Sequence, residues 1–285
     1  MKQLTKYLAI GLATVFTAVA SHAETNVQFA LDWKFEGPSA PYFLAIDNGH
    51  FAAADMKVEI SPGKGSLDAI PKVATGAFPF GFADINSLIK FLDQNPGAPV
   101  TAVMMVYDKP PFAVIGRKSK GVSGPGDLEG SVLGAPPPDG AWAQFPSFAK
   151  ANNINIDKIT VEPVGFPTRE PMLAEGKVDS VTGFSFSSYL NLVRLGVPED
   201  DISTILMADH GLMLYGNAVI VNTEFAKANP DMVKKVESTS SGEYSGLVSI
   251  YSVPVDAFET TAVSSCVVAD ILRAKSVWRS EIARE

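Results

Sequence analysis

Two segments of this chain repeat the same order of predicted elements, and this repeat constrains the fold more than any other feature. The first segment begins at VEI and passes through a loop, a helical stretch ending at Gly76, a short apolar strand and Asp84. The second begins at VEP and follows the same order through Gly176 to Phe184, so eight residues separate the last two positions in both segments. Chance recurrence of a common unit is the alternative. The matched spacing favours two similar α/β lobes.

The local patterns outside the repeat agree with an α/β fold. Short apolar or alternating runs predict strands at residues 27–32, 56–60 and 80–82. Helices are predicted at residues 41–51, 67–75 and 85–93. Because strands alternate with helices, we expect largely parallel sheets.

Two extended stretches connect the predicted lobes, at residues 101–117 and 214–222. Together they predict that the second lobe is inserted into the first, with a ligand cleft between them. The predicted division is a signal peptide at 1–23, the first part of lobe one at 24–110, lobe two at 111–214, a return to lobe one at 215–236, and an atypical tail at 237–285.

The first 23 residues have the layout of a secretory signal peptide. Lys2 and Lys6 precede an apolar run at residues 7–20, and Ser21-His22-Ala23 supplies small residues at the cleavage site. The run is shorter than the roughly 20 apolar residues of a membrane-spanning helix. We therefore expect cleavage after Ala23 and a periplasmic protein.

Composition excludes several classes of protein. The formal net charge of −8 gives no basic footprint for nucleic acid. The single cysteine, Cys266, excludes an internal disulfide. Beyond the signal peptide only His50 and His210 remain, with no spacing typical of a metal site, and the sequence holds no Gly-x-Ser-x-Gly or Gly-x-Gly-x-x-Gly motif. The sequence therefore predicts a protein that is not an enzyme and uses no cofactor.

Polar helix starts are the candidate binding elements. The loop at Gly65 and Ser66 opens a helix, and free amides there would suit an anion or a polar ring edge. Asp84 with Ser87 and, in the other lobe, Asp139 begin further helices. Each of these residues has helix capping as an alternative role. Their convergence on one cleft favours ligand binding.

Aromatic side chains accompany these polar positions and could stack against a flat ligand. Trp33 follows the first predicted strand, where loop residues often carry function. The other candidates are Tyr42, Tyr107, Trp142 and Phe184. Buried packing is the alternative for each ring.

The segment that begins LDWKFEGPSAPYFLAIDNGHF and continues through SPGKGSLDAIPKVATGAFPFGFADINSLI resembles the NMT1/THI5-like solute-binding proteins. Further matching segments are DLEGSVLGAPPPDGAWAQF, FPTREPMLAEGKVDSVTGFSFSSY and MADHGLMLYGNAVIVN, so the resemblance covers residues 27–236. It implies a type II periplasmic-binding-protein fold, with two α/β lobes and two crossover strands. It also implies a monomer that delivers a small solute to an ABC transporter permease.

The resemblance carries over to particular residues. Trp33 matches the ring-stacking position, Tyr42 the next aromatic position, Gly65 and Ser66 the loop that meets the ligand, and Asp84 and Ser87 the following helix start. It implies a solute of the nitrate, sulfonate, taurine or pyrimidine-precursor class. Pyrimidine-precursor binders read LDWxPNxxH, whereas this chain reads LDWKFEGPS. The solute therefore stays open.

Two further expectations concern relatives and the tail. The same superfamily contains a thiamine-pyrimidine synthase, and this enzyme is the alternative function. A resemblance to that enzyme would imply a cysteine cluster, whereas this chain has a single cysteine. The Ser/Val-rich sequence after Glu237 departs from the family pattern. We interpret the tail as the product of a frameshift or truncation.

Overall fold

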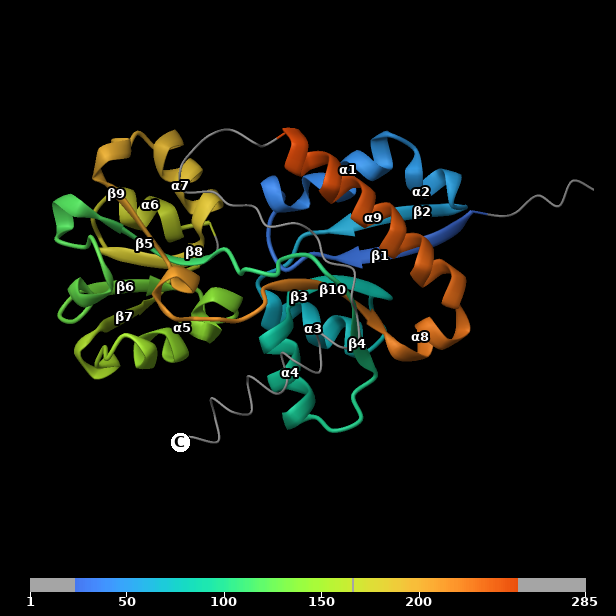
Figure 1. Cartoon of the computed structure of the whole chain (residues 1–285), viewed down its shortest axis with the longest axis horizontal. Coiled ribbons are helices and arrows are strands. Elements are labelled where there is room, and N and C mark those ends of the chain that lie inside the picture. The colour runs from blue at the N-terminus through green and yellow to red at the C-terminus, as the bar shows by residue number, and fades with distance from the viewer. Residues whose placement is uncertain (1–23, 166, 251–285) are drawn as a thin grey trace, which may run out of the picture.

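The computed structural model describes residues 24–165 and 167–250. These residues form two lobes, each built on a five-stranded sheet with helices on both faces (Figure 1). The predicted signal peptide and the tail beyond Ile250 lie outside the described residues. The two-lobed α/β prediction is confirmed.

The first lobe is coloured blue, teal and orange in Figure 1 because its chain comes from both ends of the sequence. Its strand order is β2-β1-β3-β10-β4. The strands are β1 (Thr25–Ala30), β2 (Met56–Ser61), β3 (Phe80–Asp84), β4 (Val100–Met105) and β10 (Asn217–Asn222). Its helices are η1 (Gly37–Ser39), α1 (Ala40–Asp47), α2 (His50–Ala53), α3 (Ser66–Ala74), α4 (Ile85–Gln94), α8 (Thr223–Ala228) and α9 (Pro230–Ile250).

The second lobe has the strand order β7-β6-β8-β5-β9. The strands are β5 (Phe112–Arg117), β6 (Val132–Ala135), β7 (Thr160–Pro163), β8 (Ser180–Phe184) and β9 (Ile202–Leu206). The α-helices are α5 (Gly140–Ala151), α6 (Arg169–Ala174) and α7 (Ser185–Arg194). Short 3₁₀ turns complete the lobe: η2 (Lys118–Lys120), η3 (Pro125–Asp127), η4 (Ile156–Lys158), η5 (Glu199–Asp201) and η6 (Met207–His210).

The sequence repeat corresponds to a structural repeat. The order β2–α3–β3–α4 in one lobe matches β7–α6–β8–α7 in the other. Helices α3 and α6 are each followed by a glycine with positive φ, 78° at Gly76 and 71° at Gly176. Glycine adopts this left-handed conformation without steric cost, so it ends both helices at equivalent positions.

The sheets are largely parallel, as predicted, with one reversed strand in each. β1 runs parallel to β2 and β3, and β10 runs antiparallel to β3 and β4. In the second lobe β5 takes the reversed position between β8 and β9. Each reversed strand is the first one reached after the chain passes between lobes, from β4 to β5 and from β9 back to β10.

Both faces of each sheet are buried because side chains alternate along the strands. In β10, Val219 and Val221 pack into one apolar cluster with α1 and α9, whereas Ala218 and Ile220 pack into another with α3 and α4. All four side chains are fully buried. The second lobe has two equivalent clusters.

One expectation about helices needs correction. The helix predicted at residues 41–51 is divided into α1 and α2, because Gly49 adopts a left-handed φ of 73° between them. At the other end of the chain, α9 continues from Pro230 through Glu237 to Ile250, and Val236 packs in the core of the first lobe. The predicted atypical tail therefore begins within a helix, and its remainder lies outside the described residues.

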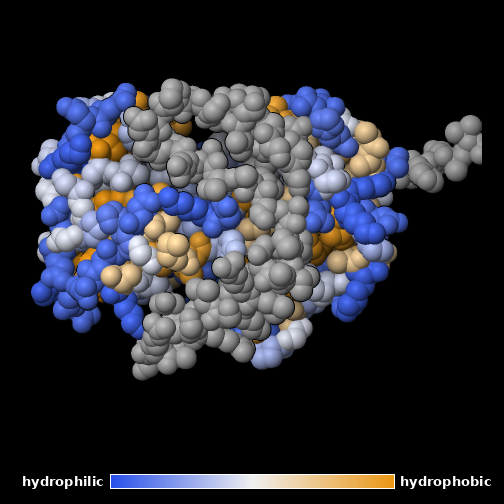
Figure 2. Space-filling view, viewed as in Figure 1, coloured by the Kyte–Doolittle hydropathy of each residue, from blue (hydrophilic) through white to orange (hydrophobic). Residues whose placement is uncertain are grey.

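The outer surfaces at both ends of the molecule are mostly hydrophilic in the space-filling view (Figure 2). Among the described residues, no helix combines the length and apolar character needed to cross a membrane.

Candidate functional site

A cavity lies between the two lobes and takes its walls from both. The empty space between its walls, counted together with the solvent in its open mouth, is about 450 Å³. Its lining residues are Leu31, Asp32, Trp33, Lys34, Pro38, Ser39 and Phe82 from the first lobe and Asp139, Arg169, Phe184 and Ser187 from the second. Three predicted site residues, Trp33, Asp139 and Phe184, therefore line one cavity.

Trp33 supplies the aromatic wall on the first-lobe side. It follows β1 in the loop that leads to η1, and the guanidinium of Arg169 from the second lobe lies over one face of its ring, 4.4 Å from the ring centroid. A planar cation over an indole face is attracted by the ring quadrupole. The site therefore already holds a flat, cationic group against Trp33.

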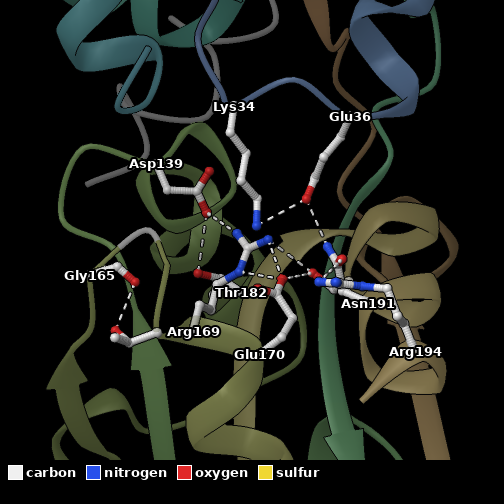
Figure 3. Close-up of polar contacts among 11 residues, drawn as sticks. Lys34, Glu36, Asp139, Gly165, Arg169, Glu170, Thr182, Asn191 and Arg194 are labelled. Carbon is white, nitrogen blue, oxygen red and sulfur yellow. Dashed lines mark hydrogen bonds and ion pairs between the residues drawn. The ribbon is translucent and has the colours of Figure 1, made fainter. Parts of the chain in front are cut away.

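Arg169 belongs to a buried ionic cluster at the start of α6 (Figure 3). Its Nε and Nη2 atoms donate to Glu170 Oε1 at 2.8 and 2.5 Å, and Nη2 also donates to Ser188 Oγ at 3.1 Å. Asp139 Oδ2 lies 4.0 Å from Nη1 and accepts from Thr182 Oγ1 at 3.4 Å. Both Arg169 and Glu170 have only 2% of their side-chain surface exposed. The guanidinium is fixed and largely neutralised by these partners.

The acidic members of this cluster differ in their titration. Burial by itself raises the pKa of Glu170, but the charge and hydrogen bonds of Arg169 outweigh it and hold that pKa below the usual value. Burial also raises the pKa of Asp139, and the more distant Arg169 charge offsets it only in part. Glu170 is therefore the carboxylate that is ionised most firmly.

Asp32 lies on the opposite wall, directly after Leu31 at the end of β1. Its Oδ2 atom accepts from Asn217 Nδ2 at 2.6 Å and from Ser66 Oγ at 3.3 Å. Burial raises the pKa of Asp32 to about 7, the Asn217 hydrogen bond lowers it, and the charge of Asp139 across the cavity raises it further. Asp32 therefore exchanges its proton near neutral pH.

The raised pKa of Asp32 predicts a stability that depends on pH. Between pH 5 and 7 the unfolded chain ionises this group while the folded chain keeps it protonated, so the free energy of unfolding falls as pH rises. The difference between wild type and Asp32→Asn should change by about 2 to 3 kcal/mol across that interval. Urea unfolding of both proteins at pH 5 and pH 7 measures this change.

The control is Asp201→Asn. Asp201 has a lowered pKa, so the difference in the free energy of unfolding between this variant and wild type should stay constant above pH 5. If the difference in the free energy of unfolding between wild type and Asp32→Asn is the same at pH 5 and pH 7, the raised pKa of Asp32 is contradicted.

Asp84 and its neighbours form a polar network beneath the cavity rather than its wall. Asp84 caps α4 by accepting from the amides of Asn86 and Ser87 at 3.2 and 2.8 Å, and from Ser87 Oγ at 2.6 Å. Ser66 Oγ accepts from the Asp84 amide at 2.9 Å. Asp84, Ser87 and Ser66 are at most 1% exposed. Their role in the structure is to hold helix starts and the Asp32 carboxyl in position.

The expectation of free amides at the Gly65–Ser66 loop is wrong for most of the loop. The amides of Gly63 and Gly65 donate to the carbonyl oxygens of Trp33 and Asp32. The amides of Lys64 and Leu67 donate to Asp68 Oδ2 and to the carbonyl of Pro138. These amides already donate hydrogen bonds within the protein, so they do not form a binding site for an anion.

Three predicted aromatic residues pack elsewhere. Tyr42 is 1% exposed and lies among the core rings of Phe29 and Phe82. Trp142 stacks on Phe145 at 5.4 Å in the core of the second lobe. Tyr107 lies edge-on between Phe82 and Phe184, behind the cavity wall. The structure does not place Tyr42, Trp142 or Tyr107 among the lining residues.

Lys34, Phe82, Ser187 and the Arg169–Glu170 pair were missed by the sequence predictions. Lys34 follows Trp33 directly and forms an ion pair with Glu36 at 3.0 Å. Glu36 also accepts from Asn191 of the second lobe at 2.8 Å, so this loop reaches across the cleft (Figure 3). The sequence signal for this pair was its place in the segment FPTREP. That segment follows a strand of the second repeat, as the Gly65–Ser66 loop follows a strand of the first.

The lobes contact one another directly beside the cavity. Gln144 of α5 donates to Asp84 Oδ2 at 2.9 Å, and the Leu67 amide donates to the Pro138 carbonyl at 3.2 Å. With the Glu36–Asn191 bond, these contacts hold the two lobes together. In residues 24–165 and 167–250, no group of three or more His, Cys, Asp or Glu side chains could hold a metal ion.

Two lobes that alternate β-strands and helices around a shared cavity define a two-lobed binding fold. The NMT1/THI5 like family matches residues 37–243 of the chain. The chain belongs to this family, and the predicted resemblance is confirmed.

Curated relatives are binding proteins. The riboflavin-binding protein RibY of Chloroflexus aurantiacus is 26% identical over 236 residues, which cover 82% of this chain and 62% of RibY. The chain therefore spans less than two thirds of that relative. A formylaminopyrimidine-binding protein of Halalkalibacterium halodurans is 25% identical over 266 residues, covering 84% of this chain and 79% of that protein.

Solved structures share the fold. The alkanesulfonate-binding protein SsuA from Xanthomonas axonopodis pv. citri, bound to MOPS, has a TM-score of 0.67 at 14% identity and covers 91% of this chain and 93% of its own. A Bordetella bronchiseptica protein has a TM-score of 0.64 at 19% identity, with 92% and 82% covered. At this identity the likeness establishes the type II periplasmic-binding-protein fold alone.

Proposed function

We propose that this chain is the solute-binding protein of an ABC importer and captures a small organic solute between its lobes. The observation that carries the proposal is the cavity whose walls come from both lobes, with Trp33 on one side and Arg169 and Phe184 on the other. A solute seated there would contact both lobes at once, so its binding energy would favour their closure.

Family membership and the relatives support a role in binding rather than catalysis. The matched relatives bind riboflavin and formylaminopyrimidine, and a structural neighbour binds an alkanesulfonate. We infer that this chain likewise releases its solute unchanged to a permease in the inner membrane. Export to the periplasm, cleavage of residues 1–23 and a monomeric state belong to the same proposal. So does the division into lobe one at 24–110 with 215–236 and lobe two at 111–214.

The proposal is tested by a thermal-shift screen of the purified protein, followed by calorimetric titration. The screen contains riboflavin, aminopyrimidines, alkanesulfonates, taurine, nitrate and aromatic carboxylates. A ligand that binds only the folded state raises the melting temperature by mass action. Mass spectrometry of the recovered solute should show it unaltered. A chemically changed product would contradict the binding role.

Trp33→Ala should weaken binding of the solute found in this screen by about tenfold or more, because a stacking surface is lost. Trp33 is only half-buried, so the fold should persist. Calorimetric titration measures the affinity. Phe35→Ala is the matched control, since this ring lies in the same loop, is 53% exposed and packs edge-on against Phe43. Equal affinities for both variants would exclude stacking on Trp33.

A further inference from the structure

Two helix starts near the cavity, those of α4 and α5, carry carboxyl groups of the protein itself. Asp84 is the N-cap residue of α4, and Asp139 is the N-cap residue of α5. Unpaired amides and the helix dipole make such positions favourable for anions. A negatively charged solute would meet the carboxyl group of Asp139 in the cavity wall, while Asp84 already occupies the start of α4 beneath it. In the loop before α3, most amides already donate hydrogen bonds to oxygen atoms of the protein.

The cationic side chains that line the cavity already have carboxylate partners. Arg169 is bonded to Glu170, and Lys34 lies 3.0 Å from Glu36. An oxyanion would have to compete with these partners for the same charges. The cavity therefore offers an anionic solute little unneutralised positive charge.

Two carboxyl groups face the cavity from opposite lobes. Asp32 is 8% exposed, and its hydrogen-bond donors Asn217 and Ser66 are neutral. Asp139 is 5% exposed, with Thr182 at 3.4 Å and Arg169 no nearer than 4.0 Å. Closing the lobes brings these like charges together in a medium of low dielectric, which is unfavourable unless a proton or a donor group lies between them.

We propose that the solute is a planar molecule, neutral or cationic, whose N–H groups bridge the carboxyl groups of Asp32 and Asp139, and that oxyanions are excluded. The inference rests on the proposed function. The rings of Trp33 and Phe184 select a flat solute, and the two carboxyl groups select its donor edge. Because each carboxyl group belongs to a different lobe, the same contacts select the solute and draw the lobes together.

A series of probes with one shape and different charge tests this inference. Calorimetric titration at pH 7.5 compares benzamidine and benzamide with benzoate and benzenesulfonate. Benzamidine should bind about tenfold or more tightly than either anion, because its N–H donors form charge-assisted hydrogen bonds with carboxylates. Asp32→Asn and Asp139→Asn should each reduce the affinity for benzamidine by about tenfold. Asp231→Asn, at a side chain that is 91% exposed on α9, should leave it unchanged.

The outcomes separate the two proposals. Tighter binding of benzoate or benzenesulfonate than of benzamidine would overturn the inference about charge while leaving capture between the lobes intact. Unchanged affinity in both Asp32→Asn and Asp139→Asn would overturn the bridging role of these carboxyl groups. If wild type binds none of the four probes and none of the screened solutes, the proposed function fails and this inference fails with it.

Discussion

Replacing Arg169 with methionine should lower the free energy of unfolding by about 3 to 5 kcal/mol, because it leaves a buried carboxylate without its partner. Glu170 is only 2% exposed and receives two hydrogen bonds from Arg169. Asp139 would lose its nearest cation as well. Urea denaturation at neutral pH measures the loss. The loss should become smaller toward pH 4 to 5, where Glu170, no longer held at a lowered pKa, takes up a proton.

Two further variants make this prediction specific. Lys227→Ala removes an ion pair with Glu224 whose side chains are 73% and 68% exposed, and it should cost less than about 1 kcal/mol. Arg169→Met combined with Glu170→Gln should recover part of the loss, since a neutral amide is less costly to bury than an unpaired charge. A loss in Arg169→Met no larger than in Lys227→Ala would show that the buried cluster contributes little to stability.

The architecture could be predicted from the sequence because its signals are local. Gly76 and Gly176 end equivalent helices, and each adopts the positive φ that favours glycine. The strand and helix runs between them need only neighbouring residues to be recognised. The break between α1 and α2 was missed although its signal is local as well: the polar stretch Asp47-Asn48-Gly49 contains the Asn-Gly pair typical of a turn, and Gly49 adopts a left-handed φ of 73° there.

The site could be predicted only in part, because the same residue types serve cores and clefts. Trp33 and Phe184 line the cavity, whereas Tyr42 and Trp142 pack into the lobes. Sequence pattern cannot separate these cases, since a ring needs an apolar neighbour in either setting. Which wall each ring joins is decided by contacts between distant elements.

Arg169 shows why some site residues could not be predicted from the sequence. A buried arginine requires a partner and space, and both come from tertiary structure. Glu170 provides the partner. The space comes from Gly183 in β8, where a methyl group would lie 2.8 Å from Arg169 Nη1. In the sequence the same arginine stands in a polar loop, where an exposed side chain is the ordinary expectation.

Replacing Gly65 with alanine should prevent the lobes from closing. A methyl group at this position would lie 2.0 Å from the carbonyl oxygen of Pro138 in the other lobe. The contact between the Leu67 amide and Pro138, 3.2 Å in the closed arrangement, could not form beside it. A clash of this kind costs about 3 kcal/mol, so the affinity for solute should fall by about 100-fold. Small-angle scattering of the purified variant should also show a larger radius of gyration than that of wild type.

Gly97→Ala is the matched control for this prediction. Gly97 has a positive φ of 84°, as Gly65 has one of 115°, but an added methyl group there would meet no atom within 4 Å. Both variants carry backbone strain, which is larger at Gly65 because its φ of 115° and ψ of 164° lie in a region almost restricted to glycine. Only the variant at Gly65 carries the clash between lobes. If both variants lose stability but only Gly65→Ala fails to close, the failure to close is caused by the clash between the lobes. Wild-type affinity and an unchanged radius in Gly65→Ala would mean that the loop and Pro138 separate when the solute is bound, and that closure depends on the Gln144 and Asn191 contacts instead.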